Sequence, residues 1–367
     1  MKIRLQHCSD STVRRRSCLK RVAFGTVLVG IVLALIIGTV ELAYRFQLLD
    51  TYRPELDAYN PPDVTGDAIA SPTLLAMGDS FTAGTASYPE VLRALLPGWR
   101  IINGGVSGTC VIQANIIAPR RLRRFKPDVC VYQIFAGNDL FDIRYPAGGE
   151  RLTSARRGYW FLASHLRALS FINYRLGQRT AGSPSTYASS VWLPNNSDIF
   201  SIDRFDQRER LYLATEPSLL ENQVLVLPPR ADDYERLLQG LARIRAMCRK
   251  SNTTLVLLLI PHAVQVAPVY MDRMRQIGAT FTAPERMMAL DYPFLSGIRN
   301  VFSNDSAVVV LDTLATLQAA ERDGTPVYFA NDGHLNRAGQ DRVAQVVFDA
   351  VIKIYSEGSE SEPLSGY

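Results

Sequence analysis

The stretch that decides the fold is residues 73–84, which read TLLAMGDSFTAG. Its first five residues are an apolar run that ends at Gly78, and such a run is typical of a buried β-strand. Glycines on both sides of the following turn let the backbone bend sharply and expose the hydroxyl of Ser80. A serine at a strand-to-helix turn is placed to attack an acyl carbon. A strand followed by Gly-Asp-Ser is, however, more often an ordinary turn.

Four more apolar runs follow along the chain. They lie at residues 99–103 (WRIIN), 128–135 (DVCVYQIF), 253–260 (TTLVLLLI) and 307–311 (AVVVL). Segments with helical spacing alternate with them, at residues 88–96, 111–124, 232–250 and 335–355. Strands that are apolar on both faces and alternate with helices predict a parallel sheet covered by helices on both sides. We therefore expect a three-layer, doubly wound α/β domain over residues 72–355, with reactive groups at the carboxyl ends of its strands.

The charge and the cysteines of the chain exclude some functions. Of the 367 residues, the first 21 hold seven basic residues and one acid, so a net charge of +5 leaves −1 for the remainder. A nucleic-acid-binding domain needs a basic patch within its folded part, so no nucleic-acid partner is expected. The five cysteines have no metal-ligand spacing, and we expect neither a metal nor a cofactor. A disulfide between two of Cys110, Cys130 and Cys248 remains an alternative.

An apolar segment near the N-terminus predicts a membrane anchor. Residues 22–40 read VAFGTVLVGIVLALIIGTV, without a charge, a length that suits a hydrocarbon core of about 30 Å. Because basic residues precede it, the positive-inside rule puts residues 1–21 in the cytoplasm and the rest across the membrane, in the periplasm of a bacterium. The alternative, a cleaved signal peptide, has a shorter apolar core and a small-residue cleavage site. We expect an uncleaved, single-pass transmembrane helix over residues 22–44.

Three further segments are expected to lie outside the regular α/β pattern. Residues 45–71 carry three prolines and scattered acids, which indicates a stalk or linker. Residues 146–230 interrupt the alternation of strands and helices, so they form an insertion that is either a lid or a surface elaboration. Residues 356–367 (SEGSESEPLSGY) have the composition of a disordered tail.

Polar motifs follow the other strands. The second strand precedes NGGVSGTC, where Gly108 can bring a backbone N–H to an oxyanion, and the third precedes AGNDL, where Asn138 can donate its amide. Taken alone, the first is a flexible turn and the second an Asx turn. The last strand precedes YFANDGHLNRAGQ, in which His334 is suited to act as general base for Ser80 and Asp332 to orient its imidazole.

A further histidine, His262, ends the fourth strand in LLLIPHAVQV. It is a candidate substrate contact, although packing of the loop is the more common role for such a residue. Asp79 and Asp139 are expected to support their turns through hydrogen bonds rather than to act as bases.

In their order along the chain, these motifs resemble the four blocks of the SGNH branch of the GDSL hydrolase family. The blocks match Gly78-Asp79-Ser80, Gly108, Gly137-Asn138, and Asp332 with His334. The resemblance covers residues 72–355 apart from the insertion. It implies a flavodoxin-like fold, ester chemistry, and an oxyanion hole formed by the backbone N–H groups of Ser80 and Gly108 with the amide of Asn138.

One departure from the family pattern bears on the activity. Most of the family has Asp-x-x-His, whereas this chain has Asp332-Gly333-His334, and Asn331 carries no charge. The spacing is similar to that of SGNH-like acetyltransferases of exopolysaccharide modification, such as the alginate O-acetylation proteins. The resemblance thus implies a membrane-anchored serine esterase acting on acetyl or other acyl groups of envelope carbohydrate or lipid. Its alternative is a polysaccharide O-acetyltransferase with the same site.

Two functions of other classes were weighed against acyl transfer. A non-catalytic envelope scaffold would not need the full set of proposed catalytic residues, which is present. A nucleotide-binding doubly wound domain would need a glycine-rich phosphate loop after a strand, and no GxGxxG or Walker-type motif occurs in that position.

Overall fold

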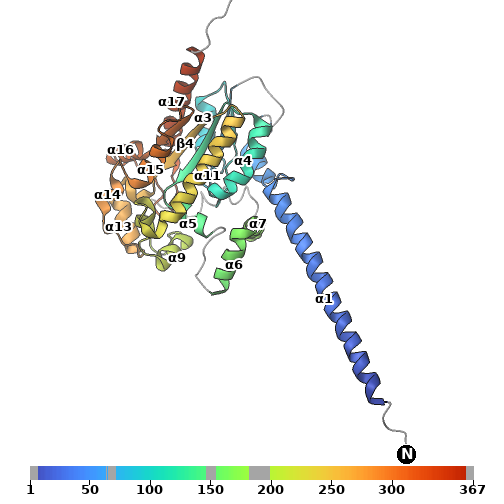
Figure 1. Cartoon of the computed structure of the whole chain (residues 1–367). Helices are drawn as coiled ribbons and strands as arrows, with labels where there is room; N and C mark the ends of the chain where they lie inside the picture. The colour runs from blue at the N-terminus through green and yellow to red at the C-terminus, as the bar shows by residue number, and fades with distance from the viewer. Residues whose placement is uncertain (1–6, 63, 65–71, 146–153, 182–198, 361–367) are drawn as a thin grey trace, which may run out of the picture. The chain divides into compact units, whose positions relative to one another are not determined.

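The computed structural model describes the chain except residues 1–6, 63, 65–71, 146–153, 182–198 and 361–367 (Figure 1). It divides into two units, Met1–Leu49 and Asp50–Tyr367. The first unit is built on helix α1 (His7–Arg45). The segment Lys20–Arg45 is long and apolar enough to cross a membrane, a property that a signal sequence shares.

The second unit contains a five-stranded parallel sheet in the order β2-β1-β3-β4-β5. The strands are β1 (Thr73–Met77), β2 (Arg100–Asn103), β3 (Val129–Phe135), β4 (Thr254–Ile260) and β5 (Val308–Asp312). Each lies within one residue of a predicted strand, because its apolar run is closed by glycine, proline or a polar turn. This strand order is that of doubly wound, flavodoxin-like sheets, so the predicted fold is confirmed.

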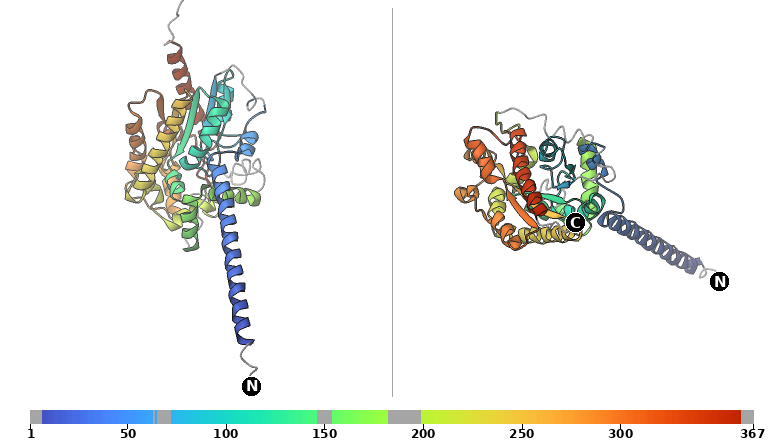
Figure 2. Two further views of the ribbon diagram at one scale, coloured as in Figure 1. Left: turned by 45° about the vertical axis from the view of Figure 1, so that its right-hand side comes forward. Right: turned by 90° about the horizontal axis from the view of Figure 1, so that it is seen from above.

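Helices cover both faces of the sheet. The helices that the structure describes in this unit are α2 (Arg53–Tyr59), α3 (Tyr88–Leu95), α4 (Val111–Phe125), α5 (Asp139–Arg144), α6 (Ser154–His165), α7 (Arg167–Ala181), α9 (Gln207–Thr215), α10 (Leu219–Val224), η1 (Pro228–Arg230), α11 (Ala231–Lys250), α12 (Ala263–Val266), α13 (Pro268–Gln276), α14 (Pro284–Met288), α15 (Pro293–Phe302), α16 (Leu314–Arg322) and α17 (Arg337–Glu360). Helices α4 and α11 pack together, and so do α3 and α17 (Figures 1 and 2). Since crossovers between parallel strands are right-handed, the two pairs lie on opposite faces.

The register of the strands brings their carboxyl ends to one edge. Met77 at the end of β1 pairs with Tyr132, and Phe135 at the end of β3 pairs with Ile260 at the end of β4. The interior strands β1 and β3 are buried along their whole length, while the edge strand β5 is half-buried. The loops after β1, β2, β3 and β4 therefore start from a rigid frame on the same side of the domain.

The expected stalk over residues 45–71 is wrong for its middle part. Pro54 occupies the first turn of α2, where proline favours a helix start over an extended linker. Leu56 and Tyr59 of this helix are buried, and Asp50 lies 3.2 Å from the guanidinium of Arg121. The α/β unit therefore begins at Asp50 and leaves only a short connection after α1.

In the insertion and at the C-terminus, the structure forms helices that the composition of these segments did not predict. In the described parts of residues 146–230 the chain forms α6, α7, α9, α10 and η1. Helix α17 continues to Glu360, so the expected disordered tail is wrong for residues 356–360. The remainder of that tail lies outside the described residues.

Candidate active site

The turn after β1 is held by bonds to the neighbouring strand β3. A Cβ atom at Gly78 would lie 2.4 Å from both the Gln133 Oε1 and the Thr82 Oγ1, so only glycine fits there. The backbone N–H of Asp79 donates to the Gln133 Oε1 at 3.1 Å. The carboxylate of Asp79 accepts the backbone N–H of Phe81 at 2.9 Å. Asp79 thus supports the turn, as expected, and the next residue, the predicted nucleophile, is half-buried at the carboxyl end of β1.

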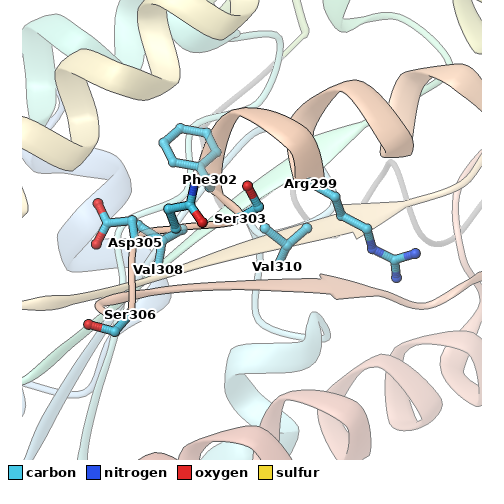
Figure 3. A pocket seen from close by; sticks show the side chains of 8 residues that line it. Arg299, Phe302, Ser303, Asp305, Ser306, Val308 and Val310 are labelled. Carbon is cyan, nitrogen blue, oxygen red and sulfur yellow. The ribbon is translucent and has the colours of Figure 1, made fainter.

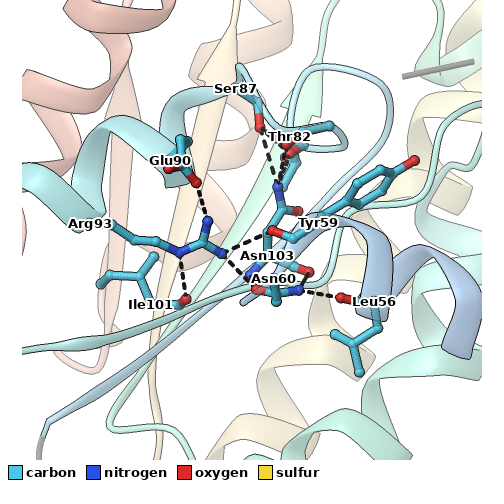
Figure 4. Close-up of polar contacts among 10 residues, drawn as sticks. Leu56, Tyr59, Asn60, Thr82, Ser87, Glu90, Arg93, Ile101 and Asn103 are labelled. Atoms are coloured by element: carbon cyan, nitrogen blue, oxygen red, sulfur yellow. Dashed lines mark hydrogen bonds and ion pairs between the residues drawn. The ribbon is translucent and has the colours of Figure 1, made fainter. Parts of the chain in front are cut away.

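A second set of bonds ties the same loop to β2 and to the segment after α2 (Figure 4). The amide nitrogen of Asn103 donates to the carbonyls of Thr82 at 2.8 Å and Gly84 at 3.0 Å. Its backbone N–H donates to the Oδ1 of Asn60 at 2.8 Å. Asn60 also accepts a bond from the guanidinium of Arg93 at 2.7 Å. The loop that carries the serine is therefore bonded to both strands that flank β1, and Asn60 holds Asn103 in place.

The three residues predicted to act together form one chain of hydrogen bonds. Ser80 Oγ lies 2.7 Å from His334 Nε2. His334 Nδ1 is hydrogen-bonded to Asp332 Oδ1, which also accepts the backbone N–H of His334 at 2.9 Å. The imidazole packs on Phe81 with ring centroids 4.8 Å apart. The side chains of His334 and Asp332 stay 25% and 23% exposed, so a substrate can reach the imidazole.

Asn331 stands three residues before His334, where most of the SGNH pattern has the aspartate, and it has a structural role instead. Its side chain is fully buried. Its Oδ1 accepts the backbone N–H of Ser201 at 2.7 Å, and its Nδ2 donates to the carbonyl of Ile199 at 3.0 Å. Asn331 therefore ties the histidine loop to the insertion, a role with no signal in the sequence, because its partners lie about 130 residues away.

Charges around the imidazole set its proton affinity. Burial alone would lower the pKa of His334, but the carboxylates of Asp332, Asp79 and Asp206 raise it to about 9. Burial would raise the pKa of Asp332, yet the charge and the two N–H groups of His334 hold it below its ordinary value. The base is thus strong, and its partner stays ionised.

Asp79 is the second buried acid near the imidazole. Burial raises its pKa to about 6, although the N–H of Phe81 and the charge of His334 oppose this. Its Oδ2 has no hydrogen-bond partner in the part of the chain that the structure describes. This leaves the Asp79 carboxylate as a nearby source of negative potential rather than as a group in the hydrogen-bonded chain.

Gly108 and Asn138, the two other predicted oxyanion donors, follow β2 and β3. These strands flank β1 in the sheet, so their loops start on either side of the serine. Gly108 is exposed, has φ +68°, and has open space where a side chain would stand. Asn138 is half-buried just before α5, and its Oδ1 has no partner among the described residues. Asp139 supports that turn by accepting the N–H of Phe135 at 3.0 Å.

The expected substrate contact at His262 does not fit its surroundings. The ring is 1% exposed. Nδ1 accepts the backbone N–H of Val264 at 3.2 Å, and Nε2 lies 3.0 Å from Glu209 Oε1. His262 therefore caps α12 and contacts α9 of the insertion, and these contacts favour the packing interpretation. The sequence placed it at the right strand end but gave no sign of its burial.

The other features of this unit that could bind a ligand lie apart from this site. No group of three metal-binding side chains occurs among the described residues. A hollow beside the edge strand is lined by Arg299, Phe302, Ser303, Asn304, Asp305, Ser306, Val308 and Val310 (Figure 3). It lies beside the amino end of β5, whereas Ser80 follows the carboxyl end of β1.

Comparisons with known proteins show only distant similarity. No family model and no curated protein matches the chain. Among solved structures, one named TesA has a TM-score of 0.36 and 15% identity, covering 76% of this chain and 97% of that one. A catalytic mutant of Axe2, an acetylxylan esterase from Geobacillus stearothermophilus, has a TM-score of 0.41 and 14% identity, covering 77% and 95%. The acetyl xylan esterase AlAXEase has a TM-score of 0.40 and 11% identity, covering 76% and 99%. The function is therefore argued from the site.

Proposed function

We propose that the chain is a serine esterase of the SGNH type that works through an acyl-enzyme on Ser80. One observation carries the proposal: Ser80, His334 and Asp332, which are 254 and 2 residues apart in sequence, form one continuous hydrogen-bonded chain at the carboxyl end of β1. A serine joined to a base that is itself oriented by a carboxylate is the arrangement for nucleophilic acyl transfer. A scaffold would not need it.

In the first half-reaction, Ser80 Oγ attacks the carbonyl carbon of the ester while its proton passes to His334 Nε2. Asp332 stabilises the imidazolium that forms. The tetrahedral oxyanion is bound by the backbone N–H groups of Ser80 and Gly108 and by the amide of Asn138, donors that are each worth roughly 10²–10³-fold in rate. The imidazolium then gives its proton to the leaving alcohol, and the acyl group stays on Ser80.

In the second half-reaction, His334 removes a proton from the acceptor as the acceptor attacks the acyl-serine. With water as acceptor, the products are the carboxylic acid and free Ser80. With a sugar hydroxyl as acceptor, the product is a new ester, and the same residues perform O-acetyl transfer. The hydrogen bond between Asp332 and His334 supports this second candidate as well, because their Asp-x-His spacing is similar to that of the acetyltransferase-like proteins.

The substrates we propose are acetyl or other acyl esters on envelope carbohydrate or lipid. The support is the segment Lys20–Arg45, which is long and apolar enough to span a bilayer, and the basic residues before it. We propose that this helix stays as a single-pass anchor with the N-terminus in the cytoplasm and the α/β unit outside. Sequencing the N-terminus of the protein purified from membranes tests this. A start beyond Val40 would show cleavage.

A fluorophosphonate probe tests the nucleophile. The full chain is labelled and assayed with an acetyl ester, alongside Ser80→Ala and the control Ser303→Ala, which removes an exposed hydroxyl near β5. We expect labelling and hydrolysis in the wild type and in Ser303→Ala, and neither in Ser80→Ala. Unchanged labelling of Ser80→Ala would refute the proposal. Product analysis with an added glycan then separates hydrolysis from transfer.

A further inference from the structure

Helices α6 and α7 of the insertion carry large apolar side chains that face solvent. The two helices pack against each other, with the small side chains of Ala163 and Ala168 buried. Their outward apolar residues are 43% to 67% exposed and comprise Phe161, Leu162, Ile172 and Leu176, here called the α6–α7 apolar face. Ile172 and Leu176 are four residues apart and so lie on one side of α7. Such clustered exposure marks an interaction surface.

Helix α7 is bonded to the start of the α/β unit. Arg175 forms an ion pair with the buried Glu55 at 2.6 Å, and the Tyr174 hydroxyl donates to the same carboxylate at 2.8 Å. The ring of Phe171 packs edge-on against that of Tyr52, with centroids 5.5 Å apart. These contacts fix α7 to the residues that directly follow the proposed anchor.

The length of the connecting chain limits how far α7 can lie from the bilayer. Helix α1 ends at Arg45, and Arg175 also donates to the carbonyl of Thr51. The six residue steps from Arg45 to Thr51 span at most about 20 Å when fully extended. This limit holds for any orientation of the two units. The connection itself contains the exposed apolar residues Phe46, Leu48 and Leu49.

The positive charge of the two helices favours a negatively charged partner. In sequence, α6 and α7 contain five arginines and neither Asp nor Glu, and one of these arginines is paired with Glu55. Basic helices with apolar side chains bind in the interfacial layer of anionic bilayers.

We infer that the α6–α7 apolar face rests in the interfacial layer of the anionic bilayer to which the chain is anchored. The inference rests on the anchoring part of the proposed function and adds a second contact with the membrane.

Fluorescence quenching in liposomes tests this contact with the full chain. Cys8 and Cys18 are replaced by serine, because the other three cysteines are buried. A small thiol-reactive fluorophore is placed by Ile172→Cys, by Ile352→Cys or by Val32→Cys. Nitroxide lipids serve as quenchers, labelled at the headgroup for positions 172 and 352 and in the acyl chain for position 32, which lies near the middle of the proposed span. Ile352 on α17 is the matched control, since it is the same residue type and is also 43% exposed.

In phosphatidylcholine–phosphatidylglycerol liposomes, we expect about threefold more quenching at position 172 than at position 352, decreasing in phosphatidylcholine alone. Quenching at position 32 but equally low values at 172 and 352 would overturn the membrane contact and leave the anchor intact. No quenching at position 32 would overturn both. Disulfide cross-linking between two copies at position 172, without lipid quenching there, would assign the face to a second copy of the chain and refute the inference.

Discussion

The loops that carry the serine and the histidine are built in different ways. The serine turn is fixed by the sheet itself, through Gly78 and Gln133 on β3 and through Asn103 on β2. The histidine loop depends on the insertion, because Asn331 bonds Ser201 and Ile199 there. The serine loop is therefore bonded to strands of the sheet, while the histidine loop has additional bonds to an element outside the regular α/β pattern. Substitutions at each loop separate the two contributions.

The largest effect is expected from the carboxylate that orients the base. Asp332→Asn should lower kcat/KM on the order of 10⁴-fold, because the neutral amide neither orients nor stabilises the imidazolium. The same change removes the negative charge that contributes most to raising the pKa of His334, which is about 9 in the wild type. Esterase assays of wild type and variant measure the loss, and an unchanged rate would exclude Asp332 from the site.

The pH profile gives a second test of the same pair. The base must be neutral to accept the proton of Ser80, and below its pKa the neutral fraction rises about tenfold per pH unit. Wild-type kcat/KM should therefore climb from pH 7 to a plateau near pH 9. In Asp332→Asn the residual activity should reach its plateau at lower pH. A profile that is flat over this range in the wild type would contradict the account.

Two glycine substitutions compare tight packing with backbone strain. Gly78→Ala forces a Cβ to within 2.4 Å of the Gln133 and Thr82 side chains and should lower stability on the order of 3 kcal/mol. Gly108→Ala meets no atom within 4 Å but keeps φ +68°, which costs about 1 kcal/mol. Chemical denaturation measures both. Equal losses of stability would show that the side chains around Gly78 can move aside to admit the Cβ.

The smallest effect is expected at the tie to the insertion. Asn331→Ala leaves the Ser201 N–H and the Ile199 carbonyl without their partner and should lower kcat about tenfold by loosening the histidine loop. It should also speed proteolysis within residues 199–216. Asn103→Ala is the matched variant, because it loosens the serine loop instead and should leave that cleavage unchanged. Faster cleavage in both variants would show that the two loops are not held independently.

The sequence was sufficient to predict the sheet and the proximity of the three proposed catalytic residues. Five apolar runs closed by turn residues marked the strands, and the order of the polar motifs after them predicted Ser80, His334 and Asp332 before any contact was known. These signals are local: a strand and the residue that follows it lie in one short stretch of chain. The structure placed each of them at the expected edge.

The groups that position the site escaped prediction because their partners are distant in sequence. Gln133, Asn103 and Asn331 each act across 20 to 130 residues. The short helix α2 was read as a stalk because seven residues are too few for a recognisable pattern, and its stability comes from tertiary packing. The bonds of His262 to Val264 and Glu209 left no mark in the sequence, which favoured loop packing over a substrate contact on general grounds only.

Trapping the acyl-enzyme tests the central claim most directly. The full chain is mixed with a p-nitrophenyl acetate solution, quenched in acid, digested, and analysed by mass spectrometry, with Ser80→Ala in parallel. We predict one acetyl group on the peptide that contains Ser80, formed as fast as p-nitrophenol is released, and none in the variant. Turnover that persists in Ser80→Ala, or an acetyl group on another residue at that rate, would contradict the account.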